Sequence, residues 1–305
     1  AGIDDNAYTN IMTSWIMKKT LELIKELPQQ TVTKLGLKKH ETDLFEDISK
    51  KINVISEKKI LMQFKDFDKL KEINLENYRK KYKNIGRMDR ILDSEGKDPN
   101  KYKILKQADT LMLFYLLDFD ELICILRDLG IKIRRPKKFA RKNFEYYLSR
   151  TSHGSTLSWF VHDAIAIKLN ETKHPLWKWF EEALKSDIKD IQGGTTSEGI
   201  HTGLMAGTVN LVEEYFAGLR PYKKEISLNP FIPEHWKKTY FKILNNDSSY
   251  IFDYNKDKKN ISILLQPGSK SEKARINFRK KRVYIKKGTE KGFKLKSSNF
   301  LRFFS

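Results

Sequence analysis

The chain has 305 residues, of which 39% are hydrophobic, and this is enough to bury one large core or two smaller ones. A disordered tail is therefore excluded. The formal net charge of +20 suggests a polyanion partner, but about 21 Lys and Arg against about 7 Asp and Glu lie in residues 223–305, without a clear stripe. Solvated surface charge is the favoured interpretation, and we expect no nucleic-acid partner.

No window of about twenty apolar residues occurs, and no basic cluster followed by an apolar stretch opens the sequence. These features predict a soluble, cytoplasmic protein with no membrane partner. The single cysteine, Cys124, excludes an internal disulfide. Because it lies among aliphatic residues in 122–126, we expect it to pack in the core.

Hydrophobic spacing predicts a succession of helices as far as about residue 220. The loops between them hold Ser, Thr, Gly and His, and a lysine-rich stretch at 57–103 has no clear period. Gly86 and residues 94–99 are expected to form loops. The expected helices are 7–27, 41–56, 106–117, 119–129, 140–148, a helix through 159–167, 175–186 and 201–218.

The period of the sequence changes after residue 222. Short segments rich in β-branched and aromatic residues alternate with Asn, Asp and Gly turns, which is typical of antiparallel strands. We therefore expect a helical domain at 1–222 and a small antiparallel β domain at 223–305. The expected strands are 238–244, 249–254, 260–265, 274–278 and 282–285.

The sharpest cluster of polar residues is 151–158, Thr-Ser-His-Gly-Ser-Thr-Leu-Ser, just before an expected helix. Backbone N–H groups at a helix start, hydroxyls and an imidazole could together bind an anion, and the glycine would let the anion approach closely. An ordinary Ser/Thr helix cap would need only two of these residues and stays open as the alternative.

Two further polar segments could contact a polyhydroxylated ligand. Residues 106–109, Lys-Gln-Ala-Asp, stand at an expected helix start, where a charged first turn is the simpler interpretation. Residues 187–201 form a glycine-containing loop, which could equally begin a helix. No two of the six His have the i, i+4 spacing of a zinc helix, so we expect no metal and no cofactor.

Several long sequence motifs resemble those of glycoside hydrolase family 65, whose members include phosphorylases of maltose, trehalose and kojibiose. They occur in the family's order and cover most of the chain, thinning in 29–100 and after about 240. The matching motifs are Asp4–Asn10, Lys106–Asp109, Tyr146-Tyr147, Arg150–Ser158, Ser186–Gly207, and Leu228-Asn229-Pro230 with Pro233 and Trp236.

The resemblance implies a fold that is mainly α with a β domain: residues 1–222 would be the later helices of an (α/α)6 barrel. It also implies inversion at the anomeric carbon, with a carboxylic acid protonating the glycosidic oxygen while phosphate attacks from the opposite face. The expected product is β-glucose 1-phosphate. The implied site residues are Ser152, His153, Gly154, Ser155 and Ser158 for phosphate, and Lys106, Gln107, Glu198 and His201 for the sugar.

Residues 150–158 contain no Asp or Glu. A hydrolase needs a carboxylate base beside its attacking water, but that carboxylate would repel a phosphate dianion by several kcal/mol in a partly desolvated pocket. Neutral hydroxyls with Arg150 and His153 therefore favour phosphorolysis.

In the family pattern the catalytic acid lies in an acidic motif just before the segment that corresponds to Asp4–Asn10. We therefore expect that acid upstream of Ala1, no catalytic residue within this chain, and little activity of the chain alone. Its expected partners are a disaccharide and phosphate, with the missing N-terminal half or a second copy.

Three alternatives remain open. A hydrolase of trehalose or a related α-glucoside would give only glucose when phosphate is supplied, and a non-catalytic sugar- or partner-binding remnant would give no turnover. A polyanion-binding module is the weakest alternative. The trehalose- and kojibiose-type substrates are favoured over maltose.

Overall fold

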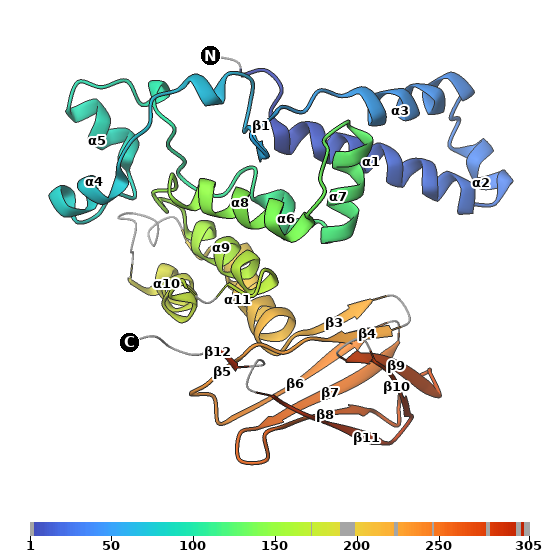
Figure 1. Ribbon diagram of the computed structural model, residues 1–305. Helices are drawn as coiled ribbons and strands as arrows, with labels where there is room; N and C mark the ends of the chain where they lie inside the picture. The colour runs from blue at the N-terminus through green and yellow to red at the C-terminus, as the bar shows by residue number, and fades with distance from the viewer. Residues whose placement is uncertain are drawn as a thin grey trace. The chain divides into compact units, whose positions relative to one another are not determined.

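The computed structural model describes residues 3–171, 173–189, 199–222, 225–245, 247–278, 281–296 and 300–301. It divides into two compact units, Ala1–Ile165 and Ala166–Ser305. Helices form most of the regular structure and strands follow them (Figure 1), which confirms a mainly α protein with a separate, largely antiparallel β region. The proposed domain boundary at 222/223 stays a prediction.

The first helix begins at a polar cap and ends before a proline. In α1 (Ala7–Glu26) the Asn6 side chain accepts from the Thr9 N–H at 2.9 Å, and Pro28 follows the C-cap Leu27. Helices α2 (Gln29–Lys34) and α3 (Lys39–Lys51) come next, and α3 lies alongside α1 (Figure 1). The helices predicted at 7–27 and 41–56 are thus present, the second beginning and ending earlier than expected.

The lysine-rich stretch of unclear period folds around a small core of its own. A hairpin of β1 (Ser56–Glu57) and β2 (Ile60–Leu61) precedes helices α4 (Leu75–Tyr82) and α5 (Met88–Ser94). Their core consists of buried Leu75, Ile85, Met88 and Leu92.

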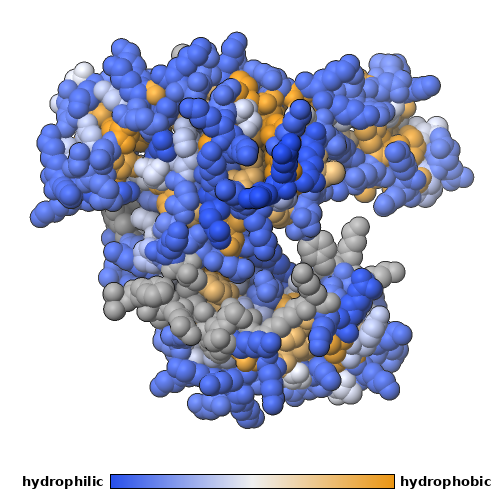
Figure 2. Space-filling model, in the orientation of Figure 1, coloured by the Kyte–Doolittle hydropathy of each residue, from blue (hydrophilic) through white to orange (hydrophobic). Residues whose placement is uncertain are grey.

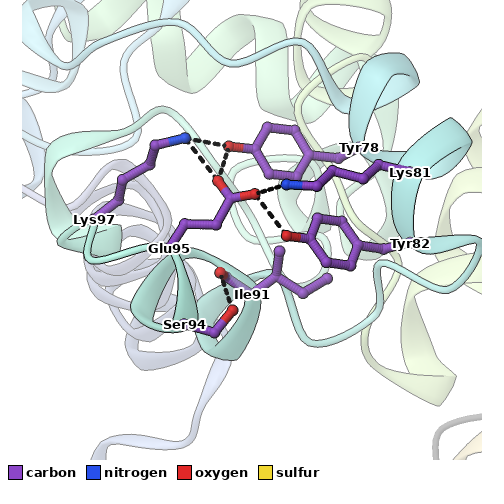
Figure 3. A network of polar contacts seen from close by, with 7 residues as sticks. All are labelled: Tyr78, Lys81, Tyr82, Ile91, Ser94, Glu95 and Lys97. Atoms are coloured by element: carbon purple, nitrogen blue, oxygen red, sulfur yellow. Dashed lines mark hydrogen bonds and ion pairs between the residues drawn. The ribbon is translucent and has the colours of Figure 1, made fainter.

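Glu95, just after α5, links α4 and α5 through a polar network (Figure 3). Its carboxylate accepts from the hydroxyls of Tyr78 and Tyr82 at 2.9 and 2.6 Å, and it pairs with Lys81 and Lys97. These charge-assisted bonds hold the pKa of Glu95 well below its ordinary value of 4.5.

The next helices are α6 (Met112–Leu116), α7 (Phe119–Asp128), α8 (Pro136–Leu148) and α9 (Thr156–Lys168). The helix predicted at 106–117 is wrong in its first half, because residues 106–111 are bends and turns. Leu105 instead pairs with Thr151 in a parallel β-bridge, so the backbone at the expected helix start is hydrogen-bonded to a segment distant in sequence. The expectation for Cys124 is also wrong: it is exposed on α7, whose buried residues lie on either side of it.

The second unit holds α10 (Leu176–Lys189), α11 (Thr202–Asn210) and a π-helical turn, Leu211–Phe216, followed by strands. One sheet has the order β10-β9-β4-β3, with β3 (Leu219–Tyr222), β4 (Glu225–Leu228), β9 (Lys273–Phe278) and β10 (Lys281–Lys286). The other has the order β11-β8-β7-β6, with β6 (Lys238–Asn245), β7 (Ser248–Asn255), β8 (Asn260–Leu265) and β11 (Glu290–Lys294).

Apolar side chains of both sheets share one core, among them Ile226, Phe252, Ile263 and Ile276, each fully buried. All five predicted strands are present. The pairings of β4 with β9 and of β5 (Ile232–Pro233) with β12 (Phe300–Leu301) are parallel, so the region is not purely antiparallel.

Hydrophilic side chains dominate the face shown in Figure 2, with apolar residues visible between them. None of the helices in the described ranges has the length and apolarity needed to cross a bilayer.

Candidate functional site

The fold brings two of the sequence-predicted site segments side by side. The Ser152 N–H donates to the Leu105 carbonyl at 2.8 Å, and the Gly154 N–H donates to the Lys106 carbonyl at 2.8 Å. Residues 105–106 and 151–154 thus run next to each other, although α6, α7 and α8 separate them in sequence. The segment expected to bind sugar and the turn expected to bind phosphate therefore meet at one place.

Gly154 is required by packing against the backbone of Gly86. A Cβ atom built on Gly154 would lie 1.8 Å from the Gly86 carbonyl oxygen and 3.2 Å from Cγ of Lys106. The backbone φ angle is not positive here, so the requirement is for space and not for an unusual conformation. The sequence suggested that this glycine makes room for a ligand, but the nearest atoms belong to the protein itself.

The His153 side chain, which belongs to the turn, is buried in the interior. The residue has a φ of 57°, an uncommon value for a residue other than glycine, and its ring stacks on Trp159 with centroids 3.7 Å apart. Its Nδ1 lies 2.9 Å from the Ser158 hydroxyl. Burial, then His162 and then Arg79, lower the pKa of His153 well below 6.5, so the ring is neutral at pH 7.

The hydroxyls of the turn differ in what they can still donate. Thr151 and Ser152 donate to backbone carbonyls, Tyr147 at 2.7 Å and Leu105 at 3.2 Å respectively. Ser155 is only half-buried.

The first backbone N–H groups around the start of α9 are not used by hydrogen bonds within the described residues. Within the described ranges, those of Ser155, Thr156 and Leu157 have no hydrogen-bond partner. These groups carry the partial positive charge of a helix N-terminus, so the start of α9 can accept a negatively charged ligand.

The residues of the 106–109 segment point in different directions. Lys106 and Gln107 are exposed, as a ligand-contacting pair needs to be. Asp109 instead accepts from Gln63 Nε2 at 2.8 Å and from the Asn6 side chain, and burial raises its pKa. Asp109 thus ties this segment to the start of α1 rather than facing a sugar.

Arg150 does not present a free charge to the turn. Its guanidinium stacks on Tyr146 at 3.8 Å and donates to Glu72 Oε1 at 2.9 Å, the oxygen that Lys103 also contacts at 2.9 Å. Sequence reasoning missed Glu72, and nothing in the lysine-rich stretch around it indicated a contact with Arg150.

The remaining sugar-site predictions fall in the second unit. His201 is held by Asp187, whose carboxylate accepts from the His201 backbone N–H at 2.8 Å and lies 2.7 Å from Nδ1 of the ring. This pairing orients the imidazole and leaves Nε2 for another contact. Glu198 lies outside the described residues.

Comparisons with known proteins identify the family of the chain. A model of the glycosyl hydrolase family 65 central catalytic domain matches residues 1–210. An uncharacterized glycosyl hydrolase of Mycobacterium tuberculosis is 41% identical over 237 residues, covering 76% of this chain and 18% of that protein. Trehalose 6-phosphate phosphorylase of Lactococcus lactis subsp. lactis is 36% identical over 244 residues, covering 79% and 30%.

A solved structure from the human microbiome, assigned by name to the kojibiose phosphorylases, has the same fold with a TM-score of 0.73. It is 22% identical, and the match covers 97% of this chain and 40% of that one. The chain spans about a third or less of the length of the curated relatives given above. Because the family model covers more than half of it, the chain belongs to glycosyl hydrolase family 65.

Proposed function

We propose that the protein containing this chain is an inverting disaccharide phosphorylase. Inorganic phosphate attacks the anomeric carbon of an α-glucoside while a carboxylic acid protonates the glycosidic oxygen, giving β-glucose 1-phosphate and a free sugar. Lys106 and Gln107 hold the glucosyl unit, and the turn from Ser152 to Ser158 holds the phosphate.

The observation that carries the proposal is the contact of the exposed Lys106 segment with residues 152–154, just before the start of α9. An anion at the N–H groups of residues 155–157 would lie beside whatever Lys106 binds, as a nucleophile must lie beside its substrate. No Asp or Glu occurs in residues 150–158, so nothing in the turn itself repels a dianion.

The roles within the turn follow from the contacts. Ser155 and the N–H groups at the helix start donate directly to phosphate. His153 and Ser158 form a neutral buried pair that shapes the wall, and Ser152 and Gly154 hold the turn against residues 105–106. His201 and Glu198 remain part of the proposed sugar site.

We propose a trehalose-type substrate, with kojibiose as the runner-up. The 36% identity to a trehalose 6-phosphate phosphorylase makes the phosphorylated disaccharide a specific second candidate. The proposal also keeps an (α/α)6 barrel for residues 1–222, of which this chain would supply the later helices, and a cytoplasmic location.

The test is a product assay on the longest natural protein that contains this sequence. It is incubated with trehalose, trehalose 6-phosphate, kojibiose or maltose, with and without phosphate, and products are followed by phosphorus and proton NMR. Phosphate-dependent β-glucose 1-phosphate is the expected product. Glucose released without phosphate would establish the hydrolase instead, and no turnover of any sugar would favour a binding remnant.

A further inference from the structure

A strongly basic segment of the first unit has no role in the proposed reaction. Residues 132–142 contain seven Lys and Arg and no Asp or Glu, and they form the loop before α8 and its first turns. With the turn between β1 and β2 they line a pocket of about 610 Å³, a volume typical of small-molecule sites. Six residues of this basic pocket are cations: Lys59, Lys132, Arg134, Arg135, Lys138 and Lys142.

The protein does not neutralise the charges of the basic pocket. Within the described part of the chain, none of the six cations forms an ion pair. Lys142 Nζ donates to the Lys58 carbonyl, which leaves its positive charge in place. Asp120 and Glu145 line an adjoining pocket and not this one. A pocket lined by charges of one sign concentrates ions of the opposite sign, so the basic pocket attracts anions.

The start of α8 adds donors to the basic pocket. The N-cap Arg135 makes no capping hydrogen bond, and the first turn of α8 carries no acidic residue. Among the described residues, the N–H groups of Lys137 and Lys138 have no hydrogen-bond partner. A helix start carries partial positive charge, so further cations there are unfavourable unless an anion is bound.

Hydrogen bonds hold the two segments of the basic pocket against each other. The Asn143 side chain accepts from the Leu61 N–H at 2.8 Å and donates to the Lys59 carbonyl at 3.2 Å. Arg127 donates to the Ile133 carbonyl at 2.9 Å and so fixes the loop before α8. The backbone therefore cannot move these like charges apart without breaking hydrogen bonds.

The turn between β1 and β2 carries lysines where glycine is usual. Lys58 and Lys59 have φ angles of 50° and 67°, in a two-residue turn that joins the paired residues Glu57 and Ile60. Asn-Gly is favoured in such turns, because side chains without a polar cap are strained at positive φ. Strain kept at an exposed position indicates that the side chains have a function.

We propose that the basic pocket binds a chain of phosphate groups, either a short free polyphosphate or the polyphosphate of a nucleotide. This goes beyond the proposed function and does not depend on it. A single phosphate group carries about two charges near neutral pH, too few for six cations, whereas a chain can reach cations of both segments. The apolar lining residues Ile133 and Phe139 would contact the nucleoside of a nucleotide.

The test measures binding by isothermal titration calorimetry to the longest natural protein that contains this sequence. The ligands are orthophosphate, tripolyphosphate and ATP, in buffer without magnesium. Tripolyphosphate, ATP or both should bind at least about tenfold more tightly than orthophosphate, because each further charged hydrogen bond adds affinity.

Two variants separate the basic pocket from the general positive charge of the chain. Arg135→Gln with Lys138→Gln should weaken the binding about 10- to 100-fold without lowering the melting temperature, since it removes cations from a helix start. The matched control is Lys238→Gln with Lys242→Gln, two exposed lysines of β6 that do not line the pocket. It should change the binding less than about twofold, because salt screens charges that do not contact the ligand.

Lys59→Gly tests the turn separately. Glycine suits the positive φ of this position, so the variant keeps the fold. It should weaken the binding about two- to fivefold, as expected for loss of one exposed charge.

The ligand preference identifies the source of the phosphate chain. Tighter binding of ATP assigns the pocket to a nucleotide, and equal or tighter binding of tripolyphosphate assigns it to a free polyphosphate. The inference is overturned if neither binds more tightly than orthophosphate, or if the pocket variant and the control weaken binding alike. A single-stranded oligonucleotide that binds this pocket more tightly than both ligands would also overturn it. None of these outcomes uses turnover, so they are independent of the proposed phosphorylase reaction.

Discussion

Gly154→Ala is the substitution whose effect the structure determines most closely. The added methyl carbon would lie 1.8 Å from the Gly86 carbonyl oxygen and 2.7 Å from its carbon. Ordinary contacts between such atoms begin near 3.5 Å, so the two segments would have to separate by about 1.7 Å. Neither can move without cost, because Gly154 is bonded to Lys106 and the Gly86 turn is fixed by buried Ile85.

Overpacking of this kind costs about 2–3 kcal/mol in the free energy of unfolding. For a unit of 165 residues, that lowers the melting temperature by roughly 4–12 °C. A shift of an ångström or more at the start of α9 should also weaken the use of phosphate about 10- to 100-fold.

The assay is differential scanning calorimetry of the full-length protein, together with phosphate titration of its activity. Gly203→Ala is the matched control: its φ is not positive, it lies in the first turn of α11, and no atom of the described residues lies within 4 Å of the added carbon. That change should stabilise by about 0.5–1 kcal/mol. If Gly154→Ala melts with the wild type and keeps its KM for phosphate, the packing argument is refuted.

Three further predictions concern stability against pH. Hydrogen bonds to Lys81 and its neighbours hold the pKa of Glu95 well below 4.5, so the stability that Glu95 contributes is present above pH 4.5 and is lost as pH falls. Glu95→Gln should therefore lower the melting temperature at pH 7. The difference in melting temperature between variant and wild type should narrow in acid. Burial raises the pKa of fully buried Asp163 well above 3.8, so the folded state holds an extra proton and stability falls as pH rises above 3.8. Asp163→Asn should flatten that decline. A wild-type melting temperature that does not fall as pH rises above 3.8 would contradict this prediction. Burial lowers the pKa of His153 well below 6.5, so the folded state resists protonation and wild-type stability should fall as pH drops below 6.5. In urea titrations at pH 5 to 7, His153→Asn should remove this dependence of the free energy of unfolding on pH.

Much of the secondary structure could be read from local patterns. The Asn6 cap and Pro28 bound the first helix, and alternating β-branched residues marked the strands at 238–285. The helix expected at 106–117 failed in its first half because Leu105 is paired with Thr151, and no local period records such a partner. Cys124 failed because a run of apolar residues on a helix does not reveal which face is outward.

The residue types alone give the chemical character of the site: a hydroxyl-rich turn without carboxylates before α9, and a Lys-Gln pair elsewhere in the chain. Those properties depend on residue types within a few positions, so they can be read without the fold. The folded chain is needed to show that the two segments touch, that Gly154 packs against Gly86 with no room for a side chain, and that Arg150 is paired with Glu72. These outcomes depend on which distant segments the chain packs together, and residue spacing along a single sequence carries no record of that.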